Sequence, residues 1–211
     1  MNRTSSQSAG APAPVAGLLL AAGGGRRLGG RPKALLPYRG RPLVEHAARV
    51  LREGGCGPVH VVLGAASDEV AERADLSGCV PVDNPRWPEG MGTSLRAGLA
   101  SLGASGTAGA ALVLLVDQPG IGARAVARVL AAYGGSRGAL ASAAYGGRRG
   151  HPVLLGADRW ADVAAQAEGD RGARAYLRAH EAEITLVECG DVAEAYDIDT
   201  PEDLVHLTGE A

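Results

Sequence analysis

The sequence predicts an α/β protein whose doubly wound, mostly parallel sheet lies between two layers of helices. Three apolar runs, at residues 15–21, 59–64 and 110–116, lead into glycine or aspartate, as strands buried on both faces do. Apolar residues at helical spacing separate these runs. Alternating strands and helices indicate right-handed βαβ units in a three-layer arrangement.

The elements follow one another without an internal repeat, and 211 residues suit one domain. Residues 1–14 are small and polar, so we expect a disordered tail before a domain at 15–211. A weaker strand at 79–82 contains Pro81, which favours a sheet edge or an irregular strand. The other expected elements are helices near 43–51, 95–102, 126–133 and 171–180, a hairpin over 139–155, a strand at 184–187 and a last helix from Thr200.

Composition excludes several classes of protein. A net charge of −2 gives no support to nucleic-acid binding, which usually requires a basic surplus. Cys56, Cys79 and Cys189 are odd in number and far apart, so they predict neither a metal site nor a disulfide framework. The run from residue 15 to 22 is too short for a signal sequence or a membrane span. We therefore expect a cytoplasmic protein with no membrane partner.

A glycine-rich loop follows the first predicted strand, with the sequence LAAGGGRRLGGRPK at residues 20–33. It is not a Walker A loop, and Leu28 stands where the third glycine of G-x-G-x-x-G would be. Glycines let backbone N–H groups converge on an anion, and Arg27 and Lys33 supply positive charge. The alternative is a flexible surface loop. The glycine-rich loop comes directly after a buried strand, and this position favours a phosphate cradle. We expect it to face the loops after residues 82 and 116.

Six motifs in one order resemble the nucleotidyltransferases that make molybdenum cofactor dinucleotides, the molybdopterin cytidylyl- and guanylyltransferases. The resemblance covers about residues 15–207. The motifs are L-A-A-G with R-x-G and a lysine at 20–33, N-P-R-W-P-E-G-M-G-T-S-L at 84–95, D-Q-P at 117–119, G-H-P at 150–152, G-D-R-G at 169–172 and D-I-D-T-P-E-D at 197–203.

The resemblance implies a Rossmann-like nucleotidyltransferase fold and Mg²⁺-dependent transfer of CMP from CTP to molybdopterin, with release of pyrophosphate. The L-A-A-G form indicates the cytidylyl branch. The implied partners are CTP, a molybdopterin-type acceptor and, transiently, a molybdoenzyme. The alternatives are transfer to another phosphorylated small molecule, such as a sugar phosphate or a specialised metabolite, and a nonenzymatic nucleotide-binding or cofactor-delivery protein.

The same resemblance implies a role for each matching residue. Arg27, Lys33 and Asp117 are the catalytic candidates, and Asp117 with Asp199 or Asp197 would hold Mg²⁺. The acceptor would contact Gln118, Pro119, His151, Asp170 and Arg171. The nucleotide would contact Leu20, Ala21, Ala22, Gly23, Gly24, Gly25, Arg27, Lys33, Asn84, Gly90, Met91, Ser94 and Asp117.

Several of these residues have a structural alternative. Asp117 is also placed to cap the helix near Ala123, and Asp197 or Asp199 to cap the helix at Thr200. Ser94 is likewise placed to cap a helix, and Arg26 competes with Arg27 for the phosphate-binding role. Trp87 and Trp160 are expected in packing, and His151 as a turn residue is at least as well supported as a substrate contact.

Overall fold

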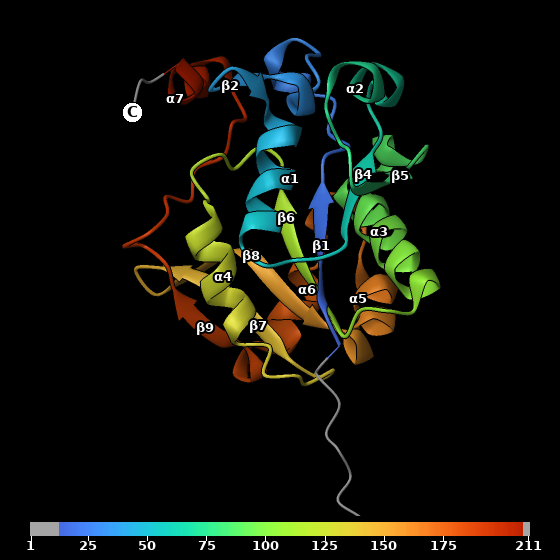
Figure 1. The fold of residues 1–211 in the computed structure, drawn as a ribbon, viewed down its shortest axis with the longest axis vertical. Helices are drawn as coiled ribbons and strands as arrows, with labels where there is room; N and C mark the ends of the chain where they lie inside the picture. Colours follow the sequence, from blue (N-terminus) through green and yellow to red (C-terminus); the bar gives the residue numbers. More distant parts are fainter. Residues whose placement is uncertain (1–12, 209–211) are drawn as a thin grey trace, which may run out of the picture.

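A computed structural model describes residues 13–208, which form one seven-stranded sheet and a two-stranded ribbon. The sheet order is β5-β4-β1-β6-β8-β7-β9, and among the seven strands of this sheet β8 alone runs antiparallel to its neighbours (Figure 1). The mostly parallel sheet is thus confirmed. The strands are β1 (Val15–Leu20), β4 (Val59–Leu63), β5 (Cys79–Asp83), β6 (Ala110–Leu115), β7 (Leu140–Tyr145), β8 (Arg148–Gly156) and β9 (Thr185–Glu188), with the ribbon formed by β2 (Pro37–Tyr38) and β3 (Arg41–Pro42).

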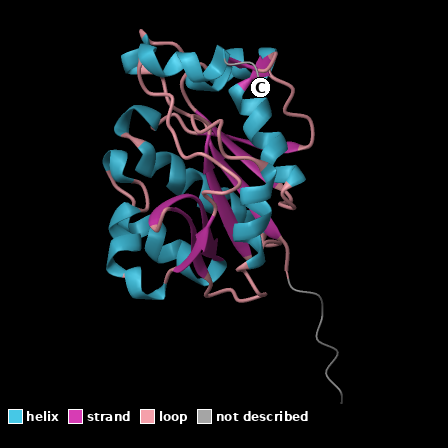
Figure 2. Cartoon of the chain, turned by 90° about the vertical axis from the view of Figure 1, so that its left-hand side faces the viewer, coloured by secondary structure: helices cyan, strands magenta, loops and turns pink. Residues whose placement is uncertain are grey.

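Helices cover both faces of the sheet, which confirms the three layers (Figure 2). Side chains of β1 alternate between two cores: Leu19 packs with α1 and α4, whereas Leu18 and Leu20 pack with α3, α5 and α6. This alternation follows from the two-residue period of a strand, so β1 must be apolar throughout. The helices are α1 (Leu43–Glu53), α2 (Ser67–Arg73), α3 (Met91–Ser105), α4 (Ala123–Ala131), α5 (Trp160–Gln166), α6 (Arg174–Ala179) and α7 (Val205–Thr208).

Most of the predicted elements agree with the structure, and the differences described here concern three helices. β5 is the edge strand that Pro81 predicted, and β7 and β8 form the predicted hairpin. The helix expected over 171–180 is interrupted, because Gly172 has φ 50° between a short 3-10 helix, η5 (Gly169–Arg171), and α6. Helices α2 and α5 lie outside the predicted set, since each fully buries only one residue and so shows no apolar stripe.

The functional loops emerge where the chain changes direction in the sheet. Leu20 of β1 pairs with Val62 of β4 and with Leu115 of β6, so three parallel strands end at one level. The chain builds β4 and β5 on one side of β1 and then crosses through α3 to β6 on the other side. Loops leaving β1 and β6 diverge there and leave a crevice, which is where open α/β sheets bind ligands.

The ends of the described chain lie apart (Figure 1). The predicted tail falls outside the described residues except for Ala13 and Pro14, and the carbonyl of Pro14 accepts a 2.9 Å hydrogen bond from the N–H of Gly109. Between residues 13 and 208, no helix combines the length and apolar character that crossing a membrane requires.

Candidate nucleotide-binding site

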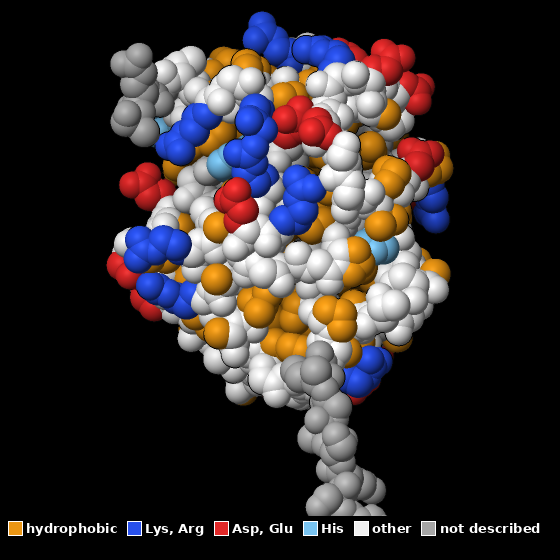
Figure 3. Space-filling view, in the orientation of Figure 1, with side chains coloured by type: hydrophobic (Ala, Val, Ile, Leu, Met, Phe, Trp, Pro, Cys, Tyr) orange, Lys and Arg blue, Asp and Glu red, His pale blue; other side chains and the backbone are white. Residues whose placement is uncertain are grey.

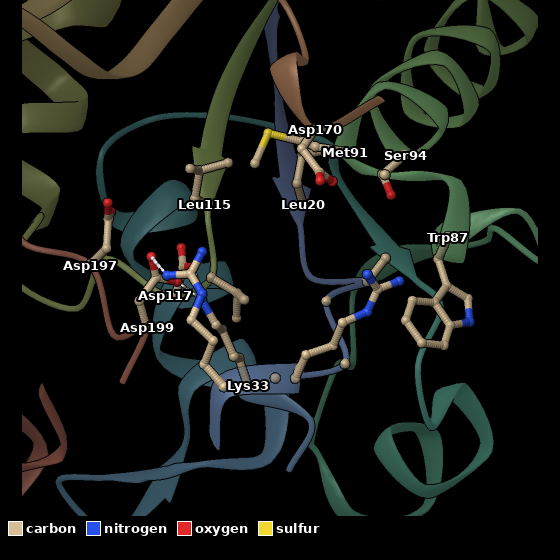
Figure 4. A pocket seen from close by; sticks show the side chains of 18 of the residues that line it. Leu20, Lys33, Trp87, Met91, Ser94, Leu115, Asp117, Asp170, Asp197 and Asp199 are labelled. Carbon is tan, nitrogen blue, oxygen red and sulfur yellow. Dashed lines mark hydrogen bonds and ion pairs between the residues drawn. The ribbon is translucent and has the colours of Figure 1, made fainter. Parts of the chain in front are cut away.

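A cavity of about 590 Å³ opens at the carboxyl ends of β1 and β6. Residues from six separate segments of the chain line it, and Figure 4 shows most of their side chains. The lining residues are Leu20, Ala22, Gly23, Gly24, Gly25, Arg26, Arg27, Lys33, Trp87, Pro88, Gly90, Met91, Ser94, Leu115, Val116, Asp117, Asp170, Arg174, Asp197 and Asp199.

The glycine-rich loop has a conformation that side chains would prevent. Gly25 has φ 59°, and a Cβ there would lie 1.9 Å from the carbonyl oxygen of Arg31. The ring of Trp87 covers Gly24, where a Cβ would come within 3.0 Å of it. No atom lies within 4 Å of the Cβ position of Gly23, so this residue leaves open space at the cavity wall. The loop therefore presents backbone to the cavity.

A three-membered charge cluster lies beside this loop (Figure 4). The ammonium of Lys33 donates to Asp117 Oδ2 at 2.6 Å and to Asp199 Oδ1 at 2.5 Å. Arg27 Nη1 donates to Asp199 Oδ2 at 3.2 Å. Because Lys33 follows β1, Asp117 follows β6 and Asp199 comes from the C-terminal segment, the cluster joins three distant parts of the chain.

Burial and charge act on these groups in opposite directions. Burial raises the pKa of Asp117 above its usual value, while the neighbouring Lys33 charge opposes the shift. Burial would lower the pKa of Lys33, but Asp117 and then Asp199 outweigh burial and raise it. The hydrogen bond from Lys33 lowers the pKa of Asp199. At neutral pH the cluster thus holds a charged Lys33 and a charged Asp199.

None of the carboxylates in this cavity caps a helix. The residue before α4 is Gly122, and no side chain caps that helix. The last helical segment, η7 (Pro201–Leu204), is capped instead by Thr200 and Asp203, which form a capping box. Asp117 and Asp199 are therefore free of the structural role considered for them, and Asp199 is the nearer of the two C-terminal carboxylates to Lys33. Asp197 also lines the cavity, where its Oδ1 accepts a 2.7 Å hydrogen bond from Gln118 Nε2.

The N-terminus of α3 forms another wall of the cavity, and Asn84 supports this wall from the side away from the cavity. Asn84 is 4% exposed, and its Nδ2 donates to Thr93 Oγ1 at 2.9 Å and to Ser94 Oγ at 3.0 Å. Asn84 does not line the cavity, whereas Ser94 does. Asn84 thus orients the first turn of α3, and Ser94 presents its hydroxyl without capping the helix.

Close backbone packing fixes the segment before α6 on this helix end. A Cβ on Gly90, whose φ is 110°, would lie 2.4 Å from the carbonyl carbon of Gly169. A Cβ on Gly92 would lie 2.8 Å from the carbonyl carbon of Ala167. Two motifs that are 79 residues apart in the sequence, counted from Gly90 to Gly169, therefore form one wall.

Comparison with known proteins now places the chain. The model of the MobA-like NTP transferase domain matches residues 17–184. The chain belongs to the MobA-like NTP transferase family. The match spans the glycine-rich loop and the α3 wall, but it ends before Asp197 and Asp199.

Members of the MobA-like NTP transferase family, and proteins related to it, differ in their named activities. A nicotine blue oxidoreductase of Paenarthrobacter nicotinovorans is 44% identical over 92% of this chain and 96% of its own. A probable molybdenum cofactor guanylyltransferase of Opitutus terrae is 40% identical over 51% of this chain and 50% of its own. The second match is thus confined to about half of each protein.

Solved structures confirm the fold. A homologue of Rv0371c from Mycobacterium sp. strain JC1 superposes with TM-score 0.75 and 32% identity over 92% of this chain and 94% of that one. Rv0371c of Mycobacterium tuberculosis H37Rv in complex with manganese has TM-score 0.74 and 25% identity, covering 92% and 97%. The Rossmann-like nucleotidyltransferase architecture is therefore shared along nearly the whole chain.

Most residues predicted for this MobA-like site line one cavity, and six do not. Ala21 is buried in the core with its N–H bonded to Val62, and Asn84 lies behind α3. The others outside the lining are Gln118, Pro119, His151 and Arg171. His151 is half-buried, and desolvation of its ring lowers its pKa to about 4, against the charge of Asp197.

Sequence reasoning did not assign a role to several residues that do line the cavity. Trp87, which the sequence places in packing, both packs on Gly24 and lines the cavity. The sequence predicts Leu115 and Val116 only as part of a strand, and both line the cavity. The G-D-x-G motif favours Arg171, whereas Arg174, three residues later, is the arginine that lines the cavity.

Proposed function

We propose that this protein is a metal-dependent nucleotidyltransferase that transfers CMP from CTP to molybdopterin and releases pyrophosphate. The observation that carries the proposal is the Lys33–Asp117–Asp199 cluster beside the glycine-rich loop in one cavity. Family membership supports the reaction class. The choice of CTP and of molybdopterin rests on the motif resemblance, including Ala22, whose methyl group would narrow the base pocket.

The donor set suits a Mg²⁺ ion that arrives with a nucleotide. Between residues 13 and 208, no three His, Cys, Asp or Glu side chains are grouped so as to hold a metal. Asp117 and Asp199 nevertheless place carboxylate oxygens around one point, where Lys33 Nζ lies. Mg²⁺ commonly takes one or two carboxylates plus substrate phosphates, so these two residues would hold it. Bound there, the ion would neutralise charge on the phosphates.

The chain's own residues would do the rest. Amides of Gly23, Gly24 and Gly25 would hold the triphosphate, because exposed backbone N–H groups bind anions. An acceptor phosphate oxygen would attack the α-phosphorus as the bond to the bridging oxygen breaks. Lys33 and Arg27 would neutralise the pyrophosphate that leaves. The cavity contributes by positioning both substrates for this in-line displacement.

The test is pyrophosphate release with each of the four ribonucleoside triphosphates, Mg²⁺ and molybdopterin. We expect release with CTP and loss of it in Asp117→Asn. Release with GTP instead would remove the base assignment while keeping the reaction. No release with any triphosphate, from a protein that still binds nucleotide, would contradict the transferase proposal.

A second candidate function is reduction of a small aromatic compound. The relative that supports it, named for an oxidoreductase activity on nicotine blue, is 44% identical across almost the whole chain. Two electrons would come from a reduced nicotinamide dinucleotide, whose pyrophosphate the same glycine-rich loop would hold. The discriminating assay follows oxidation of that dinucleotide in the presence of a dye of this class, without metal. Oxidation of the dinucleotide in this assay, together with no pyrophosphate release in the triphosphate assay, would favour this candidate.

A further inference from the structure

We propose that Arg174 binds the anionic group of the acceptor, a phosphate monoester whose body is apolar and carries hydrogen-bond donors. This inference rests on the proposed function, because it assigns the second substrate of that reaction to a place in the same cavity. No role for Arg174 follows from the sequence motifs.

Among residues 13–208, Arg174 is the one cation of the cavity that has no protein partner. The other three are engaged: Lys33 with Asp117 and Asp199, Arg27 with Asp199, and Arg26 with the carbonyl of Pro88 at 3.3 Å. Within residues 13–208, the guanidinium of Arg174 makes no hydrogen bond and no ion pair, although its side chain is exposed and lines the cavity. An arginine held this way presents all its donors to a ligand.

The position of Arg174 is fixed by the wall that carries it. Arg174 begins α6, two residues after Gly172, where a Cβ would lie 3.1 Å from the sulfur of Met91. The preceding segment is anchored to α3 through Gly90 and Gly92, as described above. The backbone at Arg174 is therefore fixed beside α3, and ligand binding would have to order only the exposed side chain.

This wall lies away from the triphosphate cluster. In Figure 4, Met91 and Asp170 lie together near Ser94, and Lys33, Asp117 and Asp199 lie at the other side of the cavity. A donor nucleotide would occupy the cations beside the glycine-rich loop. Arg174 is then the cation left for the second anion that nucleotidyl transfer to a phosphate requires.

Other side chains at or beside this cavity narrow the chemistry of the acceptor. Burial keeps His151 uncharged at neutral pH, so it adds no positive charge there. Met91, with Leu20 and Leu115, supplies apolar surface. Asp170 lines the same cavity and would repel a second anionic group, but it can accept hydrogen bonds from N–H or O–H donors. Together these side chains suit one phosphate on an apolar, donor-bearing body.

The experiment measures phenyl phosphate binding by calorimetry to protein saturated with Mg²⁺ and a CTP analogue that cannot transfer its nucleotidyl group. We expect Arg174→Met to weaken phenyl phosphate at least about tenfold, in keeping with loss of a charge-assisted bidentate contact. Arg174→Lys should weaken it less. Arg178→Met is the matched control, since Arg178 is also exposed and lies on α6 but does not line the cavity, and this variant should bind like the unaltered protein.

Affinity for the CTP analogue and the melting temperature should be the same in all variants. Unaltered affinity for phenyl phosphate in Arg174→Met, equal loss in Arg178→Met, or no phenyl phosphate binding by the unaltered protein would overturn the assignment. Failure of the unaltered protein to bind the CTP analogue is a different result: it contradicts the proposed function, and phenyl phosphate binding without nucleotide would still report on Arg174.

Discussion

Replacing Lys33 by Met should make the nucleotide-free protein bind Mn²⁺ more tightly, although Lys33 is a proposed catalytic residue. The ammonium of Lys33 lies between the two carboxylates that would hold the ion, at 2.6 Å from Asp117 and 2.5 Å from Asp199. A divalent ion needs the same oxygens, so ammonium and metal compete for one place. Nucleotide phosphates would relieve this competition by drawing Lys33 toward themselves.

The magnitude follows from the exposure of the three side chains. Lys33 and Asp117 retain 13% and 19% of their side-chain exposure, so their contact keeps the value of a charged hydrogen bond, about 1.5–3 kcal/mol. Asp199 is 41% exposed, and water screens its contact to about 0.5 kcal/mol. Together these contacts, about 2–3.5 kcal/mol, correspond to roughly 30- to 300-fold in Mn²⁺ affinity.

The assay is electron paramagnetic resonance of free Mn²⁺ at about pH 8, where protons compete less for Asp117, whose pKa burial raises. Arg31→Met is the matched control, because Arg31 lies in the same loop, is exposed and does not line the cavity. CTP affinity should fall in Lys33→Met and stay unchanged in the control. Equal Mn²⁺ affinity in Lys33→Met and the unaltered protein would refute the competition.

Three further predictions test neighbouring parts of the site. Asp199→Asn should weaken Mn²⁺ binding in the presence of CTP about tenfold, as loss of one carboxylate ligand predicts. Asp197→Asn keeps an amide oxygen that can accept the hydrogen bond from Gln118 and should change Mn²⁺ binding little; calorimetry showing the reverse would exchange the roles of the two residues. Gly25→Ala should lower the melting temperature, since its Cβ would lie 1.9 Å from a carbonyl oxygen. Gly23→Ala should keep the normal melting temperature and lose only nucleotide affinity, and equal melting temperatures of the two variants would contradict this geometry. Burial lowers the pKa of His151 to about 4 in the folded protein, so as the pH falls the imidazole of the unfolded chain takes up a proton first. The free energy of unfolding should therefore fall by about 1–3 kcal/mol between pH 6.5 and pH 4. Urea unfolding should show a smaller fall in His151→Gln, and an identical fall would count against a neutral imidazole in the folded protein.

The elements and the convergence of the loops were predictable because they depend on local patterns. The continuous apolar runs that burial on both faces requires located β1, β4 and β6. The rule that parallel strands end together then placed Lys33 and Asp117 at one edge of the sheet. An aspartate after an apolar strand also signalled that it must have a partner or a metal.

The contacts within the site were less predictable because they depend on distant parts of the chain. Nothing local identifies Lys33 as the partner of both Asp117 and Asp199. The interruption at Gly172 shifts the following helix, so Arg174 rather than Arg171 lines the cavity. Asn84 occupies a motif position expected to touch nucleotide, yet its hydrogen bonds turn it toward Thr93 behind the wall.

The most direct measurement is the anomalous signal from a crystal grown with CTP and Mn²⁺. We predict the ion between Asp117 and Asp199, with the triphosphate over Gly23, Gly24 and Gly25 and Lys33 turned from the carboxylates to the phosphates. An ion bound elsewhere, or a nucleotide lying outside the crevice between β1 and β6, would contradict the account.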